Sequence, residues 1–111
     1  MVNTVEIPEL ATHLAPSCQL LRGMANRDRL NLLCGLVQGE KTVTELGSMT
    51  GIRQPSLSQQ LGVLRNEGMV QASRMGNHIR YSISNPLVIT MMQLLYEHYC
   101  KKSFKEMNHE L

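Results

Sequence analysis

The feature that most constrains the fold is a change in hydrophobic period at Gly68. In the segment 55–67 leucines recur every three or four residues, which is the spacing of one face of an α-helix. In the segment 78–83 apolar and polar residues alternate, which is the period of a β-strand. The chain is therefore predicted to pass from helices into an antiparallel β-hairpin.

The predicted hairpin is made of the runs 69–74 and 78–83, with a Gly-Asn turn at 75–77. Asn85 and Pro86 then open a final helix. One broad apolar stripe runs along that helix: Leu87, Val88, Met91, Met92, Leu95 and Tyr99. The chain is thus expected to return to helix after the hairpin.

Two helices are predicted before residue 40. The first covers about residues 9–24, and Pro16 either lies in the first turn of a helix that starts near Ala15 or kinks a longer one. The second begins with Asn26 as its N-cap, and Gly39 is placed to end it. Its apolar stripe includes Cys34.

A helix-turn-helix is predicted next. Thr42 and Glu45 have the spacing of a capping box, and the short helix that they begin stops at Gly51. Pro55 opens the following helix after a tight turn. The predicted fold is therefore mainly α with a small β-hairpin, in the order α-α-α-α-β-β-α, which is a winged helix-turn-helix.

The length of 111 residues predicts one domain over 1–111, with a flexible arm at 1–8 and a flexible tail at 102–111. No apolar run is long enough to span a bilayer, and the acidic N-terminus is unlike a signal peptide, so we expect no membrane partner and a cytoplasmic protein. Three cysteines without a C-x-x-C pair do not make a disulfide scaffold. The low aromatic content of 4% disfavours a base-stacking surface for RNA or single strands.

Positive charge is concentrated in the segment 53–80. Its charged residues are four arginines and Glu67, so its net charge is +3, against +2 for the whole chain. Arginine is the side chain best suited to phosphate. The sequence has no acidic residue between Glu45 and Glu67. The only carboxylate of the predicted 55–67 helix is therefore at its last residue, and the rest of the helix has no negative charge that would repel a phosphate.

The polar face of the 55–67 helix is predicted to read double-stranded DNA. Glutamine offers a donor and an acceptor to adenine in the major groove, and serine adapts to a base or a phosphate. The hairpin is expected to contact the backbone or the minor groove. The predicted DNA-binding residues are Arg53, Gln54, Ser56, Ser58, Gln59, Gln60, Arg65, Arg74, Asn77, His78 and Arg80.

The first and last helices, 10–25 and 87–99, carry more apolar surface than a small domain hides alone. Pairing of these helices across a two-fold axis would place two recognition helices roughly 34 Å apart, so we expect a homodimer on a pseudo-palindromic site. A winged-helix module that binds another protein instead of DNA is the alternative. An enzyme is not expected, because His98 and Cys100 point in different directions on a helix and no phosphate-binding glycine loop or carboxylate pair is present.

The sequence resembles the ArsR/SmtB family of winged-helix repressors over roughly residues 15–101. The resemblance is carried by Met24-Ala25-Asn26, by Arg29-Leu30, by Thr44-Glu45-Leu46 and above all by the segment 54–65, QPSLSQQLGVLR. It is closest to the BigR/HlyU/SqrR branch, whose members sense reactive sulfur or redox state. The resemblance implies that Gln54, Ser56, Ser58 and Gln59 contact the operator, and that the unliganded dimer binds DNA.

The metal sites of other family members have no counterpart here. A thiolate site on the third helix needs cysteine near residues 44–47, where this chain has Thr, Glu, Leu and Gly. A site on the last helix needs Asp and His near its start, which reads Asn85-Pro86-Leu87-Val88. No metal or other cofactor is therefore expected, although a metal-responsive regulator remains an alternative.

Cys34 and Cys100 are the remaining candidates for a sensor. From the pattern alone, Cys34 on its apolar stripe is most simply a buried, unreactive thiol, whereas Lys101 and Lys102 favour a thiolate at Cys100. The resemblance implies that the two sulfurs approach each other and that a reactive sulfur species or an oxidant links them as a disulfide or a polysulfide. Structurally silent cysteines are the alternative, and Cys18 has no expected role in sensing.

Overall fold

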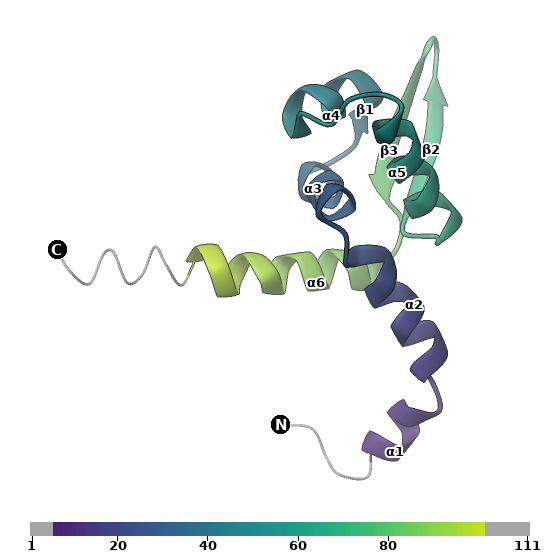
Figure 1. Ribbon diagram of the computed structural model, residues 1–111, viewed down its shortest axis with the longest axis vertical. Coiled ribbons are helices and arrows are strands. Elements are labelled where there is room, and N and C mark those ends of the chain that lie inside the picture. Colours follow the sequence, from purple (N-terminus) through teal and green to yellow (C-terminus); the bar gives the residue numbers. More distant parts are fainter. Residues whose placement is uncertain (1–5, 102–111) are drawn as a thin grey trace, which may run out of the picture.

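The computed structural model describes residues 6–101 and confirms the winged helix-turn-helix (Figure 1). The first five residues of the expected arm and the whole expected tail, 102–111, lie outside the described residues. The elements in chain order are α1 (Glu6–Ala11), α2 (Leu14–Met24), α3 (Arg27–Leu36), β1 (Lys41–Thr42), α4 (Val43–Thr50), α5 (Ser56–Asn66), β2 (Val70–Met75), β3 (His78–Ile83), α6 (Pro86–Tyr96) and the π-helical turn η1 (Glu97–Lys101).

The expected first helix is divided into α1 and α2. The chain turns at Thr12, whose hydroxyl donates to the Glu9 carbonyl at 2.6 Å, and at His13, whose N–H donates to the Leu10 carbonyl at 2.9 Å. Pro16 is the third residue of α2. Proline has no N–H to donate and is tolerated in a first helical turn, so the first of the two predicted alternatives is correct.

The predicted helix caps are confirmed. Asn26 accepts a hydrogen bond from the Arg29 N–H at 3.0 Å, and Asn85 accepts one from the Leu87 N–H at 3.0 Å. Thr42 and Glu45 form the full capping box of α4. Gly51 ends α4 with a φ of +75°, a left-handed conformation that glycine adopts without a steric cost.

The sheet has three strands in the order β1-β3-β2, all antiparallel. The predicted hairpin is confirmed, but Met75 belongs to β2 and faces His78, so the loop is only Gly76-Asn77. The strand β1 was not predicted, because a strand of two residues shows no period. It pairs Thr42 with Arg80 and so joins the capping box of α4 to the hairpin.

The core lies between α3, α4, α5 and the base of the hairpin. Leu57, Leu61 and Leu64 of α5 are buried, as their spacing predicted. Tyr81 and Ile83 of β3 pack against this core. Ile79, which was predicted to share their face, is 47% exposed, because the end of the hairpin extends past the helices (Figure 1).

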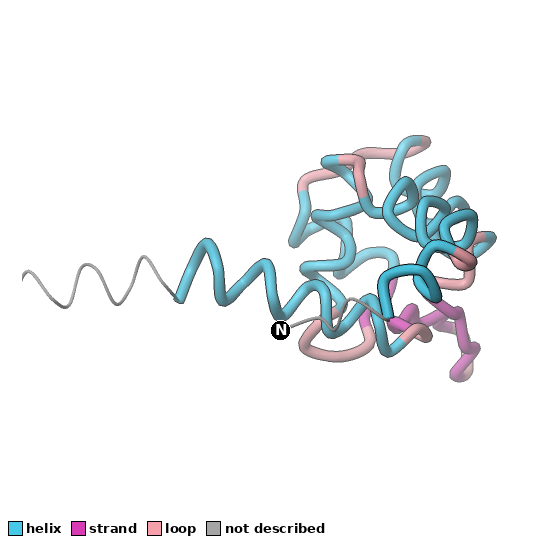
Figure 2. The backbone as a smooth tube through the Cα atoms, turned by 90° about the horizontal axis from the view of Figure 1, so that it is seen from below, coloured by secondary structure: helices cyan, strands magenta, loops and turns pink. Residues whose placement is uncertain are grey.

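The first and last helices extend away from this core. In Figures 1 and 2, α6 and η1 project to one side of the molecule, and Figure 1 shows α2 and α1 descending from it. The radius of gyration is 16.6 Å. A compact domain of this length has a radius of gyration of about 13 Å, so the molecule is markedly extended. Within residues 6–101, no helix combines the length and the apolar character needed to cross a membrane.

Candidate nucleic-acid interface

The helix α5 presents an open polar face. Its three leucines anchor the opposite face in the core, which leaves Ser58 and Gln59 exposed and Ser56 half-buried. The Gln54 side-chain carbonyl accepts a hydrogen bond from the Ser58 N–H at 3.0 Å. Gln54 therefore helps to satisfy the free N–H groups at the start of the helix, and its side chain is itself exposed.

Gln60 differs from its neighbours on α5. It is half-buried, and its side-chain carbonyl accepts a hydrogen bond from the Arg29 guanidinium at 2.9 Å. Its acceptor is thus used within the protomer, whereas Gln59 is exposed.

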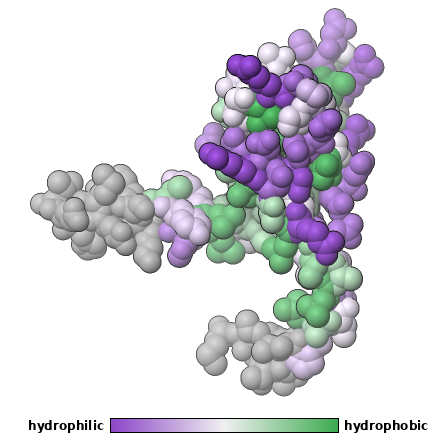
Figure 3. All heavy atoms as spheres, viewed as in Figure 1, coloured by the Kyte–Doolittle hydropathy of each residue, from purple (hydrophilic) through white to green (hydrophobic). Residues whose placement is uncertain are grey.

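Exposed basic residues flank this face. Arg53 precedes α5 and Arg65 lies near its end. At the tip of the hairpin, Arg74, Asn77 and His78 are all exposed. Figure 3 shows hydrophilic residues over the part of the molecule that carries α4, α5 and the hairpin. Apart from the half-buried Ser56 and Gln60, the predicted residues of the helix and of the hairpin tip are therefore open to a polyanion.

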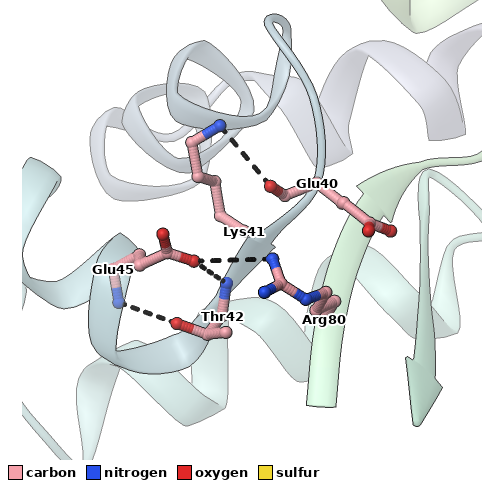
Figure 4. Close-up of polar contacts among 5 residues, drawn as sticks. All are labelled: Glu40, Lys41, Thr42, Glu45 and Arg80. Carbon is pink, nitrogen blue, oxygen red and sulfur yellow. Dashed lines mark hydrogen bonds and ion pairs between the residues drawn. The ribbon is translucent and has the colours of Figure 1, made fainter. Parts of the chain in front are cut away.

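Arg80 is less free than the other three predicted DNA-binding arginines. Its guanidinium lies 3.9 Å from the Glu45 carboxylate, and its side chain is 36% exposed (Figure 4). The same carboxylate oxygen accepts the Thr42 N–H at 2.8 Å. Hydrogen bonds from the Thr42 backbone and side chain, and after these the charges of Arg80 and Lys41, hold the pKa of Glu45 below its usual value.

Cys34 on α3 and Cys100 in η1 are both exposed. The interpretation of Cys34 as a buried thiol is therefore wrong, because this face of α3 borders an open groove against α6, lined also by Met92, Tyr96 and Glu97. Partial burial raises the pKa of the Cys34 thiol, and the negative charge of Cys100 raises it further. Cys100 thus lies within electrostatic range of Cys34, 66 positions earlier in the chain.

The described residues also locate the other candidates. Cys18 is exposed on α2. His98 makes an edge-to-face ring contact with Tyr99 at a centroid distance of 4.6 Å, whereas His109 lies outside the described residues. Among residues 6–101, no group of three or more His, Cys, Asp or Glu side chains is arranged to hold a metal ion.

Large apolar side chains are exposed on the projecting helices. Figure 3 shows hydrophobic residues along α6 and on α2 and α1, away from the hydrophilic region. The side chains are Leu10, Leu14 and Leu21 at the N-terminal end, and Leu87, Leu94, Leu95, Tyr96 and Tyr99 at the C-terminal end, each at least 38% exposed. An apolar surface of this extent is typical of a protein–protein interface.

Residues 26–72 match the family model described as the bacterial regulatory protein arsR family. The chain is 36% identical to the biofilm growth-associated repressor of Agrobacterium fabrum, over 89% of the chain and 85% of that protein. It is 35% identical to the transcriptional activator HlyU of Vibrio cholerae, over 87% and 90%. The structure of reduced HlyU has a TM-score of 0.78 and covers 85% of the chain and 99% of HlyU.

A solution structure from Mycobacterium bovis, the homodimeric winged helix-turn-helix DNA-binding domain Mb0332, is also similar. It has a TM-score of 0.69 at 29% identity and covers 81% of the chain and 90% of that domain. The expected resemblance to the ArsR family, and within it to BigR and HlyU, is confirmed. The relatives are transcription regulators rather than enzymes.

Proposed function

The chain belongs to the bacterial ArsR family of DNA-binding transcription regulators, and we propose that it is a homodimeric repressor whose operator affinity falls when Cys34 and Cys100 become covalently linked. The observation that carries the DNA-binding part is the open Ser/Gln face of α5 beside exposed arginines. The switch is supported by the exposure of both thiols and by the charge of Cys100, which, after partial burial, raises the pKa of Cys34.

In the proposed complex, α5 lies in the major groove and the hairpin lies along the backbone or in the minor groove. Ser58 and Gln59 read base edges, and Ser56 contacts a base or a phosphate. Gln54 acts through its free amide N–H groups. The remaining contacts, mainly with phosphates, come from Arg53, Arg65, Arg74, Asn77, His78 and, more weakly, Arg80.

The dimer is proposed from the projecting helices. A pairing of α1, α2 and α6 with their symmetry mates would cover the exposed leucines and tyrosines. It would also explain why the isolated protomer is so extended. The two α5 helices would then stand roughly 34 Å apart, one turn of DNA, which suits a pseudo-palindromic operator.

The inducer in this proposal is an organic persulfide or an oxidant of similar reactivity. Because its raised pKa leaves Cys34 less thiolate at neutral pH, Cys100 attacks first. It takes the outer sulfur of the persulfide and releases the organic thiol. Cys34 then attacks the sulfur atom of Cys100 itself, the new disulfide forms, and the transferred outer sulfur leaves as hydrogen sulfide. If Cys34 first takes an outer sulfur from a second organic persulfide, its own terminal sulfur attacks the Cys100 sulfur instead, hydrogen sulfide again leaves, and a trisulfide forms.

The link would tie η1 to α3. It would thereby change the position of α6, a helix of the proposed dimer interface, relative to the DNA-binding core. A change of about 3 kcal/mol between the two states corresponds to a loss of operator affinity of roughly 150-fold. That loss is sufficient to release a repressor.

The test uses the reduced dimer and a duplex that the wild-type protein selects from a randomised library. We expect treatment with an organic persulfide to give a Cys34–Cys100 crosslink by mass spectrometry and a parallel loss of DNA affinity. Cys18→Ser, the matched control, should behave as wild type, and Cys100→Ser should keep its DNA affinity after treatment. A crosslink that leaves DNA affinity unchanged would show that the cysteines are silent, and failure of the reduced dimer to select any duplex would overturn the DNA-binding proposal.

A further inference from the structure

Arg29 connects three helices. It lies on α3, and its Nε donates to the Gly23 carbonyl of α2 at 2.7 Å. One terminal nitrogen donates to the Arg22 carbonyl at 3.2 Å, and the other donates to the Gln60 side chain of α5 at 2.9 Å. A positive side chain thus satisfies carbonyls at the end of α2, where the helix dipole is negative, and reaches the recognition helix with its remaining terminal nitrogen.

A second set of contacts joins α2 to the end of α5. The Gln19 side chain donates to the Glu67 carboxylate at 2.8 Å. Gly23 lies so close to Met69 that a Cβ at this position would collide with the methionine methyl group. The hydrogen bonds of Arg29, the Gln19–Glu67 hydrogen bond and the close Gly23–Met69 contact therefore hold α2 against α5 and the residues that follow it.

We infer that Gln60 is a positioning residue rather than a DNA contact, and that the Arg29–Gln60 hydrogen bond sets the angle of α5 relative to α2. The inference rests on the proposed function, since α2 is proposed to form part of the dimer interface and α5 to enter the major groove. Because Arg29 joins α5 to α2, the orientation of each recognition helix depends on how α2 packs in the proposed dimer interface.

The helix that carries Arg29 also carries Cys34. The two residues are five positions apart, or about 7.5 Å along the helix axis. A crosslink that moves α3 therefore acts on the same helix that connects α2 with α5. Arg29 accordingly offers one route by which a displacement of α3 at Cys34 would reach the recognition helix.

The test compares the same substitution at two adjacent positions. Gln60→Glu keeps an acceptor for Arg29 and adds an ion pair, so DNA affinity should stay within about threefold of wild type, with an unchanged slope of log affinity against log salt. Gln59→Glu, on the open face, should weaken binding by at least about 100-fold because its carboxylate faces the DNA phosphates. Equal and large losses for both variants would overturn the inference.

A second variant removes the link. Gln60→Leu should weaken binding about tenfold, since a hydrogen bond to a charged group is lost. The salt slope should not change, because no phosphate contact is lost. Preference for the selected half-site spacing over duplexes lengthened or shortened by one base pair should fall. A reduced salt slope, or an unaltered spacing preference, would contradict a positioning role.

The wild-type measurement separates this inference from the function itself. If the wild-type dimer selects no duplex, the proposed function fails. If it selects a duplex and Gln60→Glu abolishes binding, the function stands and the positioning role of Gln60 is wrong. Circular dichroism of each variant confirms that the fold is retained.

Discussion

Arg80 shares a single carboxylate oxygen of Glu45 with the backbone N–H of Thr42 (Figure 4). The ion pair joins the middle of the strand β3 to the N-terminus of α4, where the capping box already holds the carboxylate in place. Because both side chains are partly exposed, the pair contributes little to stability. In the proposed complex, however, the Glu45 carboxylate would compete with DNA phosphates for Arg80.

The first prediction therefore concerns the two arginines of the hairpin. Arg74→Ala should reduce DNA affinity and lower the salt slope by about 0.9, the value for one phosphate contact. Arg80→Ala should have a smaller effect, and Glu45→Gln should raise affinity by releasing Arg80. The measurement is fluorescence anisotropy over a salt series. Glu40 is an exposed carboxylate of the same region, so Glu40→Gln controls for the change in net charge. An equal gain in DNA affinity from Glu45→Gln and Glu40→Gln would contradict the prediction.

The second prediction follows from the lowered pKa of Glu45. A carboxyl whose pKa is lower in the folded state than in the unfolded state stabilises the fold above its unfolded pKa. This contribution is lost as the pH falls through the folded pKa. Urea unfolding midpoints of the wild type should therefore fall with acidification, and more steeply than those of Glu45→Gln. Parallel curves for the two proteins would refute this.

The third prediction separates base reading from phosphate binding. Gln59→Ala should cost about 1–3 kcal/mol of binding and relax the preference at one base pair, with the salt slope unchanged. Arg53→Ala should weaken binding to all duplexes alike and lower the slope by about 0.9. Affinity measured on the selected duplex and its single-base variants distinguishes the two. Loss of base preference in Arg53→Ala would assign it a different role.

The fourth prediction tests the dimer. Leu94 is 60% exposed on α6 in the protomer, so Leu94→Glu should not disturb the core. If Leu94 is buried across a two-fold axis, the substitution acts twice, and the dimer dissociation constant should rise about 100-fold. Sedimentation velocity measures this. Met49→Glu, at a residue 54% exposed on α4, is the matched control and should leave the dimer intact.

The fifth prediction concerns the cysteines. Cys34 should react with iodoacetamide only at a pH above that of an ordinary thiol, because burial and the Cys100 charge both raise its pKa. Cys100→Ser should move the midpoint of Cys34 reactivity to lower pH but leave part of the shift, since the burial remains. Peptide mass spectrometry across a pH series provides the rates. An unchanged midpoint would mean that the two sulfurs do not interact.

The site was only partly predictable. The open face of α5 and the tip of the hairpin follow directly from helical and strand periods, and so the exposure of Gln59 and Arg74 was predictable. The hydrogen bonds of Arg29 to α2 and α5 were not predicted, because a lone arginine on a helix shows no pattern that distinguishes a link from a solvated charge. The exposure of Cys34 was also not visible, because an apolar stripe does not indicate whether the neighbouring helix covers it.

The sequence by itself determined the helices, their caps, the helix-turn-helix and the hairpin, and through them the fold. These features depend on residues within about four positions of one another, such as Asn26 with Arg29 or Thr42 with Glu45. The tertiary structure alone decided that Gln60 turns inward to Arg29, 31 positions away, and that Arg80 meets Glu45. Such pairs arise only when helices and strands pack, because a side chain that points away from its own helix or strand meets a partner only once the neighbouring element is in place.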